Sequence, residues 1–189
     1  IGVCTHRPMT RSAAVPGDVV ALVGSVGASE AGLRILRDSV EAHDQVRSVL
    51  LNAHRRPTPR LVEGKILAEA GILCALDVSD GLVDDLAKLC HASGVAAKLD
   101  VSAIPILHEI REVFADGYLD CVLAGGEDYA LLCTSPPTIM TKVLELLSDG
   151  STTVIGTVIR GEPGQVLIVD DKDHEITPRA RGWDHFKKT

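Results

Sequence analysis

The sequence predicts one domain, or one domain with a small appendage, of mixed α and β structure, either α+β or α/β. Two observations support this prediction. Short apolar runs bounded by Gly or Pro, typical of buried strands, alternate with longer segments whose apolar residues recur at helical spacing. The 189 residues are 46% hydrophobic, so the chain can bury one sizeable core. We find no internal repeat, heptad pattern or low-complexity tract that would indicate another architecture.

The first predicted elements are a strand and two helices. An irregular start ends in a turn at residues 16–18, and the apolar run 19–23 after it is predicted to be a strand. Helical spacing predicts a helix over 28–36, and the pattern continues over 40–50 as a second helix or a bent extension. The basic segment 54–60 contains two prolines and is predicted to be a rigid connector.

The middle of the chain is predicted to be a helix, a strand, a helix and a strand. A helix is predicted over 60–70, with Gly71 as its C-cap, because Gly readily adopts the left-handed conformation in which many helices end. The apolar run 72–76 predicts a strand, and a helix follows over 82–91. Residues 95–101 alternate enough to predict another strand.

The rest of the chain is predicted to contain two helices and three strands. A helix is predicted over 105–114 and a strand over 130–134. Two adjacent prolines favour the start of a helix that runs over 136–147. The apolar runs 154–159 and 166–169 flank a Gly-containing turn and are predicted to pair as a hairpin.

Charge and cysteine content narrow the class of protein. The net charge of -7 argues against a nucleic-acid or anionic-membrane surface, because both partners would be repelled. No apolar run approaches the roughly 20 residues that span a bilayer, and the opening residues do not resemble a signal peptide. The scattered cysteines form no C-x-x-C pair, and we expect buried thiols in a reducing cytoplasm. They are Cys4, Cys74, Cys90, Cys121 and Cys133.

Acidic side chains gather where the predicted strand 72–76 turns into the next helix. Asp77 and Asp80, three residues apart across this turn, can direct oxygen atoms at one hard cation. Mg²⁺ prefers one or two carboxylates together with water and substrate phosphates. Ser79 lies between the two carboxylates as a hydrogen-bond donor.

A purely structural interpretation of the same stretch is also open. Ser79 or Asp80 can cap the helix, while Asp84 and Asp85 lie favourably near its positive end. This interpretation is weaker for Asp77, because burying a carboxylate at the end of an apolar strand is costly unless it is paired or binds a metal.

A second acidic segment, residues 125–129, places two glycines before two carboxylates and an aromatic residue. Glycines allow a ligand to approach the backbone, and the acids, Glu127 and Asp128, can hold a cation or a ligand hydroxyl. A tight turn with solvated acids explains the pattern equally well, because Gly and Asp are ordinary turn residues.

Three further features have both a structural and a binding interpretation. Residues 24–30 follow a strand and open a helix, a context that binds phosphate, but they match neither a Walker A nor a G-x-G-x-x-G motif. Arg55, Arg56 and Arg60 can grip phosphate, although the prolines beside them favour a structural elbow. Trp183 can seal the core or stack on a flat ligand.

Five motifs together resemble the C-terminal part of bacterial thiamine-monophosphate kinases, in order and spacing over nearly the whole chain. They occupy residues 24–32, 54–60, 77–86, 125–129 and 182–186. That family belongs to the aminoimidazole ribonucleotide synthetase superfamily, whose members pair an N-terminal ATP-binding domain with a C-terminal α+β domain. The resemblance therefore implies an α+β fold with a mixed sheet packed with helices.

The resemblance implies transfer of the ATP γ-phosphoryl group to thiamine monophosphate, giving thiamine diphosphate, with ATP as co-substrate and Mg²⁺ as cofactor. It assigns six binding residues and no catalytic acid or base. They are Asp77 and Asp80 as Mg²⁺ ligands, Ser79 and Arg11 as ATP contacts, and Glu127 and Trp183 as contacts to thiamine phosphate.

The N-terminal half of that family has no counterpart in this sequence. We expect residues 1–17 to be its last strand and the linker, and residues 18–189 to be the C-terminal domain. The full-length protein is then expected to form a homodimer, and this chain alone to be inactive. Two alternatives remain: a related ATP-dependent enzyme with another small substrate, and a non-catalytic module that binds thiamine phosphates.

Overall fold

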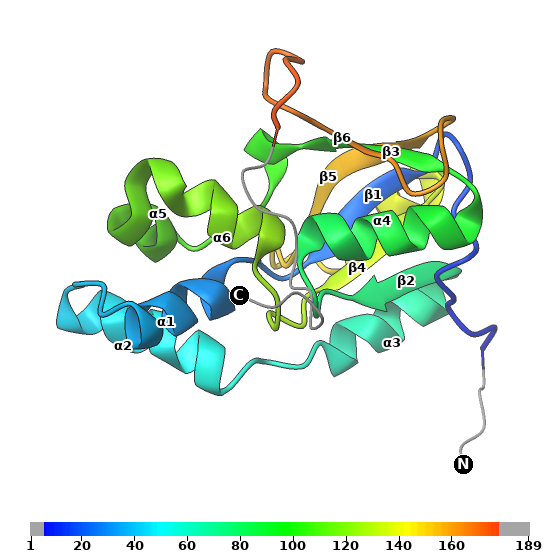
Figure 1. The fold of residues 1–189 in the computed structure, drawn as a ribbon. Coiled ribbons are helices and arrows are strands. Elements are labelled where there is room, and N and C mark those ends of the chain that lie inside the picture. The colour runs from blue at the N-terminus through cyan, green and yellow to red at the C-terminus, as the bar shows by residue number, and fades with distance from the viewer. Residues whose placement is uncertain (1–5, 178–189) are drawn as a thin grey trace.

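A six-stranded sheet forms the centre of the structure, a computed structural model that describes residues 6–177 (Figure 1). Its strand order is β2-β4-β1-β5-β3-β6. Neighbouring strands are antiparallel except β3 and β6, which are parallel, so the sheet is mixed. The strands are β1 (Val19–Val23), β2 (Cys74–Asp77), β3 (Ala96–Asp100), β4 (Leu131–Ser135), β5 (Thr152–Ile159) and β6 (Val166–Val169).

Helices cover both faces of the sheet and form a lobe beside it (Figure 1). The helices are α1 (Ala28–Arg37), α2 (Asp44–Arg55), α3 (Leu61–Ala70), α4 (Leu82–Ser93), α5 (His108–Phe114), α6 (Tyr118–Ala124) and α7 (Pro137–Leu146). Helix α4 packs on one face, α3 and α7 pack on the other, and α1, α2, α5 and α6 share a separate cluster of buried side chains. The expected mixed sheet packed with helices is confirmed.

Strand β1 contributes to the core on both faces of the sheet. Val20 and Leu22 join the cluster that includes α4, whereas Ala21 and Val23 join the cluster of α3 and α7. All four side chains are fully buried. This arrangement follows from the two-residue period of a strand, and it explains why the run is apolar at every position.

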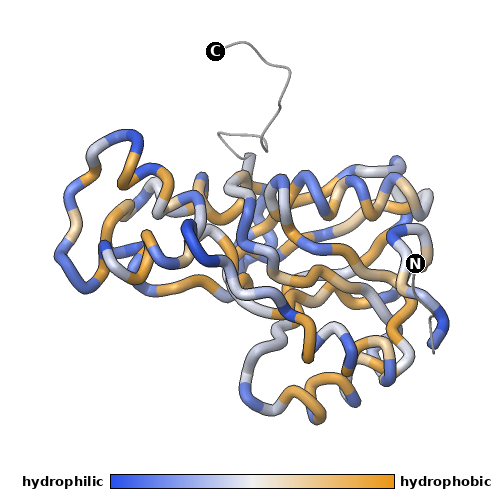
Figure 2. Tube along the Cα trace, turned by 90° about the horizontal axis from the view of Figure 1, so that it is seen from below, coloured by the Kyte–Doolittle hydropathy of each residue, from blue (hydrophilic) through white to orange (hydrophobic). Residues whose placement is uncertain are grey.

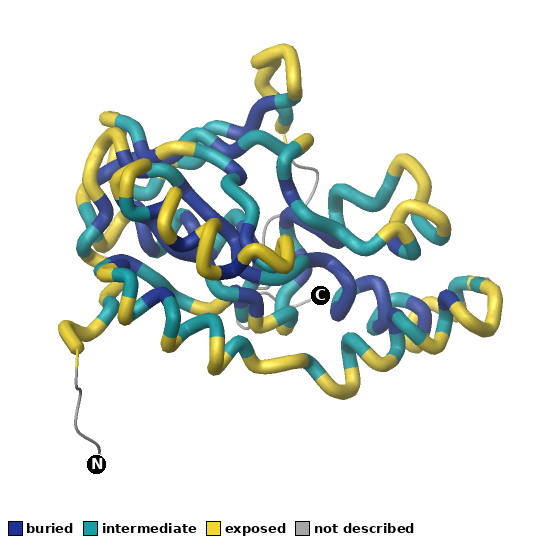
Figure 3. Tube along the Cα trace, turned by 180° about the vertical axis from the view of Figure 1, so that it is seen from behind, coloured by how far each residue is buried: buried dark blue, intermediate teal, exposed yellow. Residues whose placement is uncertain are grey.

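The exposure pattern agrees with this layering. Figure 3 shows buried residues in the strands and in the part of the lobe that adjoins them, with exposed residues at the outer turns. Hydrophobic and hydrophilic residues alternate along the helices in Figure 2, as expected for helices with one face on a core. Within residues 6–177, no helix is both long enough and apolar enough to cross a membrane.

Most predicted elements are present, with ends that differ by a few residues. The strand over 19–23 and the helix from Ala28 are confirmed. Helix α3 ends at Gly71, whose φ of 92° is left-handed, as predicted for a glycine C-cap. Helix α4 ends in the same way at Gly94.

Two helices differ from the sequence-based expectation. Helix α2 begins at Asp44 and not near residue 40, because the chain first reverses direction through Ser39, whose φ is 55°. The reversal lets α2 pack closely on α1, and a Cβ at Gly32 would overlap the carbonyl oxygen of Leu50. Helix α6 has no counterpart among the elements predicted from the sequence.

The predicted hairpin of β5 and β6 is wrong, although both strands exist. Strand β3 lies between them, antiparallel to β5 and parallel to β6. The connecting turn crosses the start of β3: the amide of Gly164 donates to the carbonyl oxygen of Val95 at 2.9 Å, and a Cβ at Gly161 would lie 2.8 Å from the Cβ of Ala96. Strand β3 therefore takes the position that a hairpin partner would occupy.

Candidate functional site

Two loops that are far apart in the sequence lie against each other. One loop, residues 78–81, connects β2 to α4, and the other, residues 125–130, connects α6 to β4. The amide of Glu127 donates to the carbonyl oxygen of Ser79 at 2.9 Å, and the amide of Tyr129 donates to that of Val78 at 3.0 Å. The two acidic segments identified in the sequence therefore form one structural unit.

Two glycines permit close contacts between the loop 78–81 and its neighbours. A Cβ at Gly126 would overlap the carbonyl oxygen of Ser79. A Cβ at Gly81 would lie 2.9 Å from the carbonyl oxygen of Ala124, and Gly81 also has a φ of 125°, which other residues rarely adopt. Gly126 thus serves the contact between the two loops, and Gly81 serves the contact of the first loop with the end of α6.

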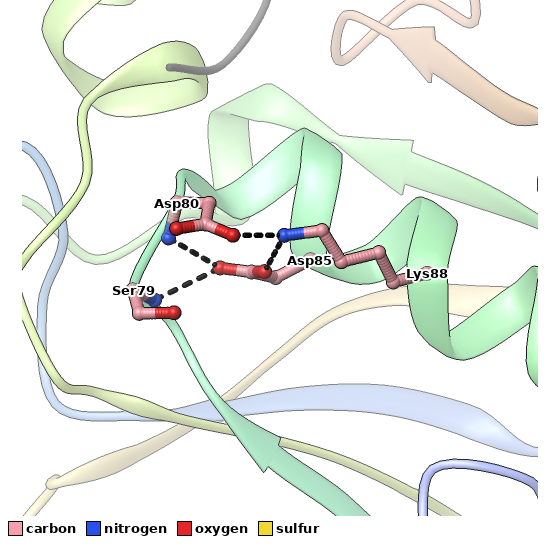
Figure 4. A network of polar contacts seen from close by, with 4 residues as sticks. All are labelled: Ser79, Asp80, Asp85 and Lys88. Atoms are coloured by element: carbon pink, nitrogen blue, oxygen red, sulfur yellow. Dashed lines mark hydrogen bonds and ion pairs between the residues drawn. The ribbon is translucent and has the colours of Figure 1, made fainter. Parts of the chain in front are cut away.

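Asp85 holds the backbone of the β2–α4 loop. Its Oδ2 accepts hydrogen bonds from the amides of Ser79 (2.8 Å) and Asp80 (2.9 Å), as Figure 4 shows. The expectation that Ser79 or Asp80 caps α4 is wrong, because Gly81 is the N-cap and no side chain caps the helix there. The expected structural role of Asp85 near the helix start holds, with the loop amides as its partners.

Lys88 joins the carboxylates of Asp80 and Asp85 (Figure 4). Its Nζ lies 2.7 Å from Oδ1 of Asp85 and also contacts Oδ2 of Asp80. Burial lowers the pKa of Lys88, but the hydrogen bonds to Asp80 and Asp85 outweigh burial and raise this pKa above its usual value. Lys88 is therefore a cation at neutral pH and neutralises part of the negative charge of the loop.

Asp128 binds the start of α1. Its carboxylate accepts hydrogen bonds from the amides of Gly27 (2.6 Å) and Ser29 (2.9 Å). Burial raises its pKa to about 6, against the opposing effect of the hydrogen bonds from Ser29 and Gly27. The interpretation in which Asp128 holds a cation or ligand hydroxyl is wrong, because both its oxygens face the helix. The phosphate-binding interpretation of residues 24–30 loses its support as well, because these amides are occupied.

The predicted metal ligands differ in their surroundings. Asp77 ends β2 opposite Leu131 and is exposed, so the argument from its burial does not apply. The side chain of Asp80 is 39% exposed and contacts Lys88. Within the described part of the chain, no three His, Cys, Asp or Glu side chains are grouped so that they could hold a metal ion. Asp77 and Asp80 therefore fit a Mg²⁺ site only if water or phosphate oxygens supply the additional ligands.

Of the other predicted site residues, Glu127 lies on the loop 125–130, whereas Arg11 lies beside the C-terminal half of α4, where its carbonyl oxygen accepts a hydrogen bond from Ser93. Glu127 is exposed, with a left-handed φ of 63°. Arg11 lines a pocket of about 490 Å³ against α4 together with Lys88 and His91. Arg60 pairs with Glu63 at 3.3 Å, consistent with a structural elbow. Trp183 lies outside residues 6–177.

Sequence reasoning missed Lys88 as part of the site. Its spacing of three residues from Asp85 on one helix was the available signal, since such pairs lie on the same helix face. The contact with Asp80 depends on the path of the loop and has no comparable signal in the sequence.

The mixed sheet, the lobe and the acidic loop pair define an α+β domain that presents carboxylates where two loops meet. The chain belongs to the family described as AIR synthase related protein, C-terminal domain, whose profile matches residues 15–169. The fold implied by the resemblance is thereby confirmed.

Two curated relatives and one solved structure show in more detail what this chain is similar to. The chain is 34% identical to a thiamine-monophosphate kinase of Escherichia coli O157:H7 and 39% identical to one of Salmonella typhimurium, over 185 residues in each case. Both comparisons cover 95% of this chain and 56% of the relative, so the chain spans about half the length of these relatives. A structure of AaThiL complexed with AMPPCP and TMP is 30% identical, with a TM-score of 0.78, covering 94% of this chain and 54% of that chain. The resemblance to the C-terminal part of thiamine-monophosphate kinases is confirmed.

Proposed function

We propose that this chain is the C-terminal part of a kinase that transfers the γ-phosphoryl group of ATP to thiamine monophosphate, giving thiamine diphosphate. The names of the relatives and the AMPPCP and TMP bound by AaThiL support the proposal. One structural observation supports the proposed function most directly. The hydrogen bond from Glu127 to Ser79 joins the segment assigned to thiamine phosphate to the segment assigned to ATP and Mg²⁺.

The proposed roles follow the chemistry of the side chains. Asp77 and Asp80 are the Mg²⁺ ligands, because hard carboxylate oxygens suit a cation that also binds phosphates. Ser79, a hydroxyl donor on the same loop, and Arg11, a guanidinium suited to phosphate, contact ATP. Glu127 and Trp183 contact thiamine monophosphate. These six assignments rest on the resemblance, and the contact between the β2–α4 loop and the α6–β4 loop supports those of Ser79, Asp80 and Glu127.

The reaction requires little proton transfer from the protein. The acceptor is a phosphate monoester with a second pKa near 6, so it is largely dianionic at neutral pH and needs no strong general base. The obstacle is repulsion between two polyanions. Bound Mg²⁺ supplies charge neutralisation on the phosphates. The chain contributes positioning: Asp85 fixes the amides of Ser79 and Asp80, and Gly126 lets the Glu127 loop lie against them.

We further infer that the active protein includes an N-terminal ATP-binding half, forms a homodimer and works in the cytoplasm. The share of the relatives that this chain covers, 56%, supports a longer enzyme. Free, buried thiols support a reducing compartment. Burial raises the pKa of Cys90 to about 11 and that of Cys121 and Cys133 to about 12, so these thiols are unreactive.

A chimera tests the proposal. The part of the Salmonella typhimurium relative that this chain does not match is fused in front of residues 1–189, and thiamine diphosphate is measured after incubation with ATP, Mg²⁺ and thiamine monophosphate. We expect product from the chimera. Binding of thiamine monophosphate without product would favour the non-catalytic module, and ATP consumption with other acceptors only would favour a related enzyme.

A specificity variant sharpens the test. Glu127→Gln in the chimera should raise the KM for thiamine monophosphate and leave the KM for ATP unchanged. Glu162→Gln, an exposed residue of the β5–β6 turn, removes the same charge and should change neither constant. Equal effects of the two substitutions would contradict the assignment of Glu127.

A further inference from the structure

We propose that Lys88 is a resident counter-ion that holds the Asp80 carboxylate while no divalent cation is bound and releases it when one binds. The inference rests on the proposed function, because it takes Asp80 as a metal ligand. Lys88 is a positioning residue in this account. Its ammonium occupies the place of a cation on Asp80 and Asp85 (Figure 4).

The two carboxylates that share Lys88 are held with unequal strength. Asp85 is buried, with 2% of its side chain exposed, and also accepts two backbone hydrogen bonds. Asp80 has 39% of its side chain exposed, and its only side-chain partner among the described residues is Lys88. Exposed ion pairs contribute little to stability, so the Asp80 contact is the one that breaks at low cost.

Because both carboxylates share one ammonium, the exchange costs the fold little stability. When Asp80 binds a divalent cation in place of Lys88, Lys88 keeps its 2.7 Å contact with Asp85. No buried carboxylate loses its charged partner, which would be strongly destabilising. The loop backbone also stays fixed, because the amides of Ser79 and Asp80 remain bound to Asp85.

The exchange sets how tightly Asp80 binds a cation. Lys88 competes directly for Oδ2 of Asp80 and repels any other positive charge nearby. A cation of higher charge that arrives with phosphate oxygens displaces the ammonium more readily than a bare cation does. Lys88 therefore disfavours occupation of the site by cations without a nucleotide.

Mn²⁺ binding to the 189-residue chain tests the inference, with free Mn²⁺ measured by electron paramagnetic resonance at low ionic strength. Asp80→Asn identifies the Asp80-dependent part of the binding. Lys88→Met should tighten that part roughly twofold to fivefold, the range expected for the loss of one partly exposed ion pair. Lys65→Met removes one exposed cation on α3 and is the matched control, for which we expect no change.

The outcomes separate the inference from the proposed function. Equal affinities of the wild type and Lys88→Met would overturn the counter-ion role and leave the metal site intact. Absence of any Asp80-dependent binding in all variants would overturn both.

A titration of the unsubstituted chain covers the case in which Lys88→Met does not fold. Added Mg²⁺ should shift the Cε and Hε resonances of Lys88 and leave those of Lys65 unchanged. Unchanged Lys88 resonances at a Mg²⁺ concentration that shifts the Asp80 carboxyl carbon would overturn the exchange, and so would the absence of any shift at Asp80.

Discussion

The amide of Glu127 donates a hydrogen bond of 2.9 Å to the carbonyl oxygen of Ser79, so two acidic segments 48 residues apart form one unit. The neighbouring pair Tyr129 and Val78 repeats the contact at 3.0 Å. Each loop is thus positioned by the backbone of the other. A change at the contact should therefore affect both loops at once.

Gly126→Ala should destabilise the protein by about 1–3 kcal/mol, because its Cβ would overlap the carbonyl oxygen of Ser79. Denaturant unfolding measures the loss. Gly117→Ala is the control, since nothing lies within 4 Å of a Cβ there, and its stability should stay close to that of the wild type. Equal stabilities of Gly126→Ala and Gly117→Ala would show that the two loops do not pack as described.

Asp85→Asn should reduce the free energy of unfolding by about 2 kcal/mol, because a buried, charged acceptor of two backbone hydrogen bonds is lost. Asp84→Asn removes the same charge one residue earlier and should cost less than about 1 kcal/mol, the range of a helix-dipole effect. Urea titrations of both variants give the comparison. A larger loss for Asp84→Asn would contradict the anchoring role of Asp85.

Asp128 should titrate near pH 6, which the pH dependence of its side-chain carboxyl carbon resonance can measure. Its folded-state pKa lies above the unfolded value of 3.8, so the folded state binds the proton more tightly. The contribution of this group to stability is therefore largest below about pH 4 and decreases as the pH rises through 6.

The Asp128→Asn variant isolates this contribution. The unfolding free energy of the wild type minus that of the variant should fall by at most about 3 kcal/mol between pH 4 and pH 7. A difference that rises over this interval would mean that the hydrogen bonds from Gly27 and Ser29 outweigh burial and lower the pKa of Asp128.

The sequence predicted those parts of the fold that depend on local patterns. Strand β1 and helices α3 and α4 were predicted because apolar spacing and left-handed glycines mark them. The position of β3 between β5 and β6 was not, because strand pairing depends on residues far apart in the chain. Helix α6 is seven residues long, too short for its period to be distinguished from a strand.

The site was predicted as residue types, without their partners. Asp77, Asp80, Asp85, Glu127 and Asp128 are equivalent as acids in the sequence. The structure separates them by what they contact: Asp85 binds the loop amides and Asp128 the start of α1. These partners come from tertiary packing. Spacing across the turn paired Asp80 with Asp77 as cation ligands, and only the resemblance to a known family separated Glu127 from Asp128.

The chain alone should form no thiamine diphosphate, because a phosphoryl-transfer site without its nucleotide-binding half lacks both positioning and charge neutralisation. The purified chain is incubated with ATP, Mg²⁺ and thiamine monophosphate. The chimera serves as the positive control. Product from the chain alone would show that no N-terminal half is required.

The rate of thiamine diphosphate formation by the chimera with Asp80→Asn tests the central claim most directly, which is that the β2–α4 loop is part of the phosphoryl-transfer site. Asp84→Asn, in the first turn of α4, is the matched control. We expect Asp80→Asn to lower kcat by about 10²-fold or more with a thermal midpoint close to that of the parent chimera, and Asp84→Asn to retain nearly full activity. Full activity of a folded Asp80→Asn chimera would contradict the account.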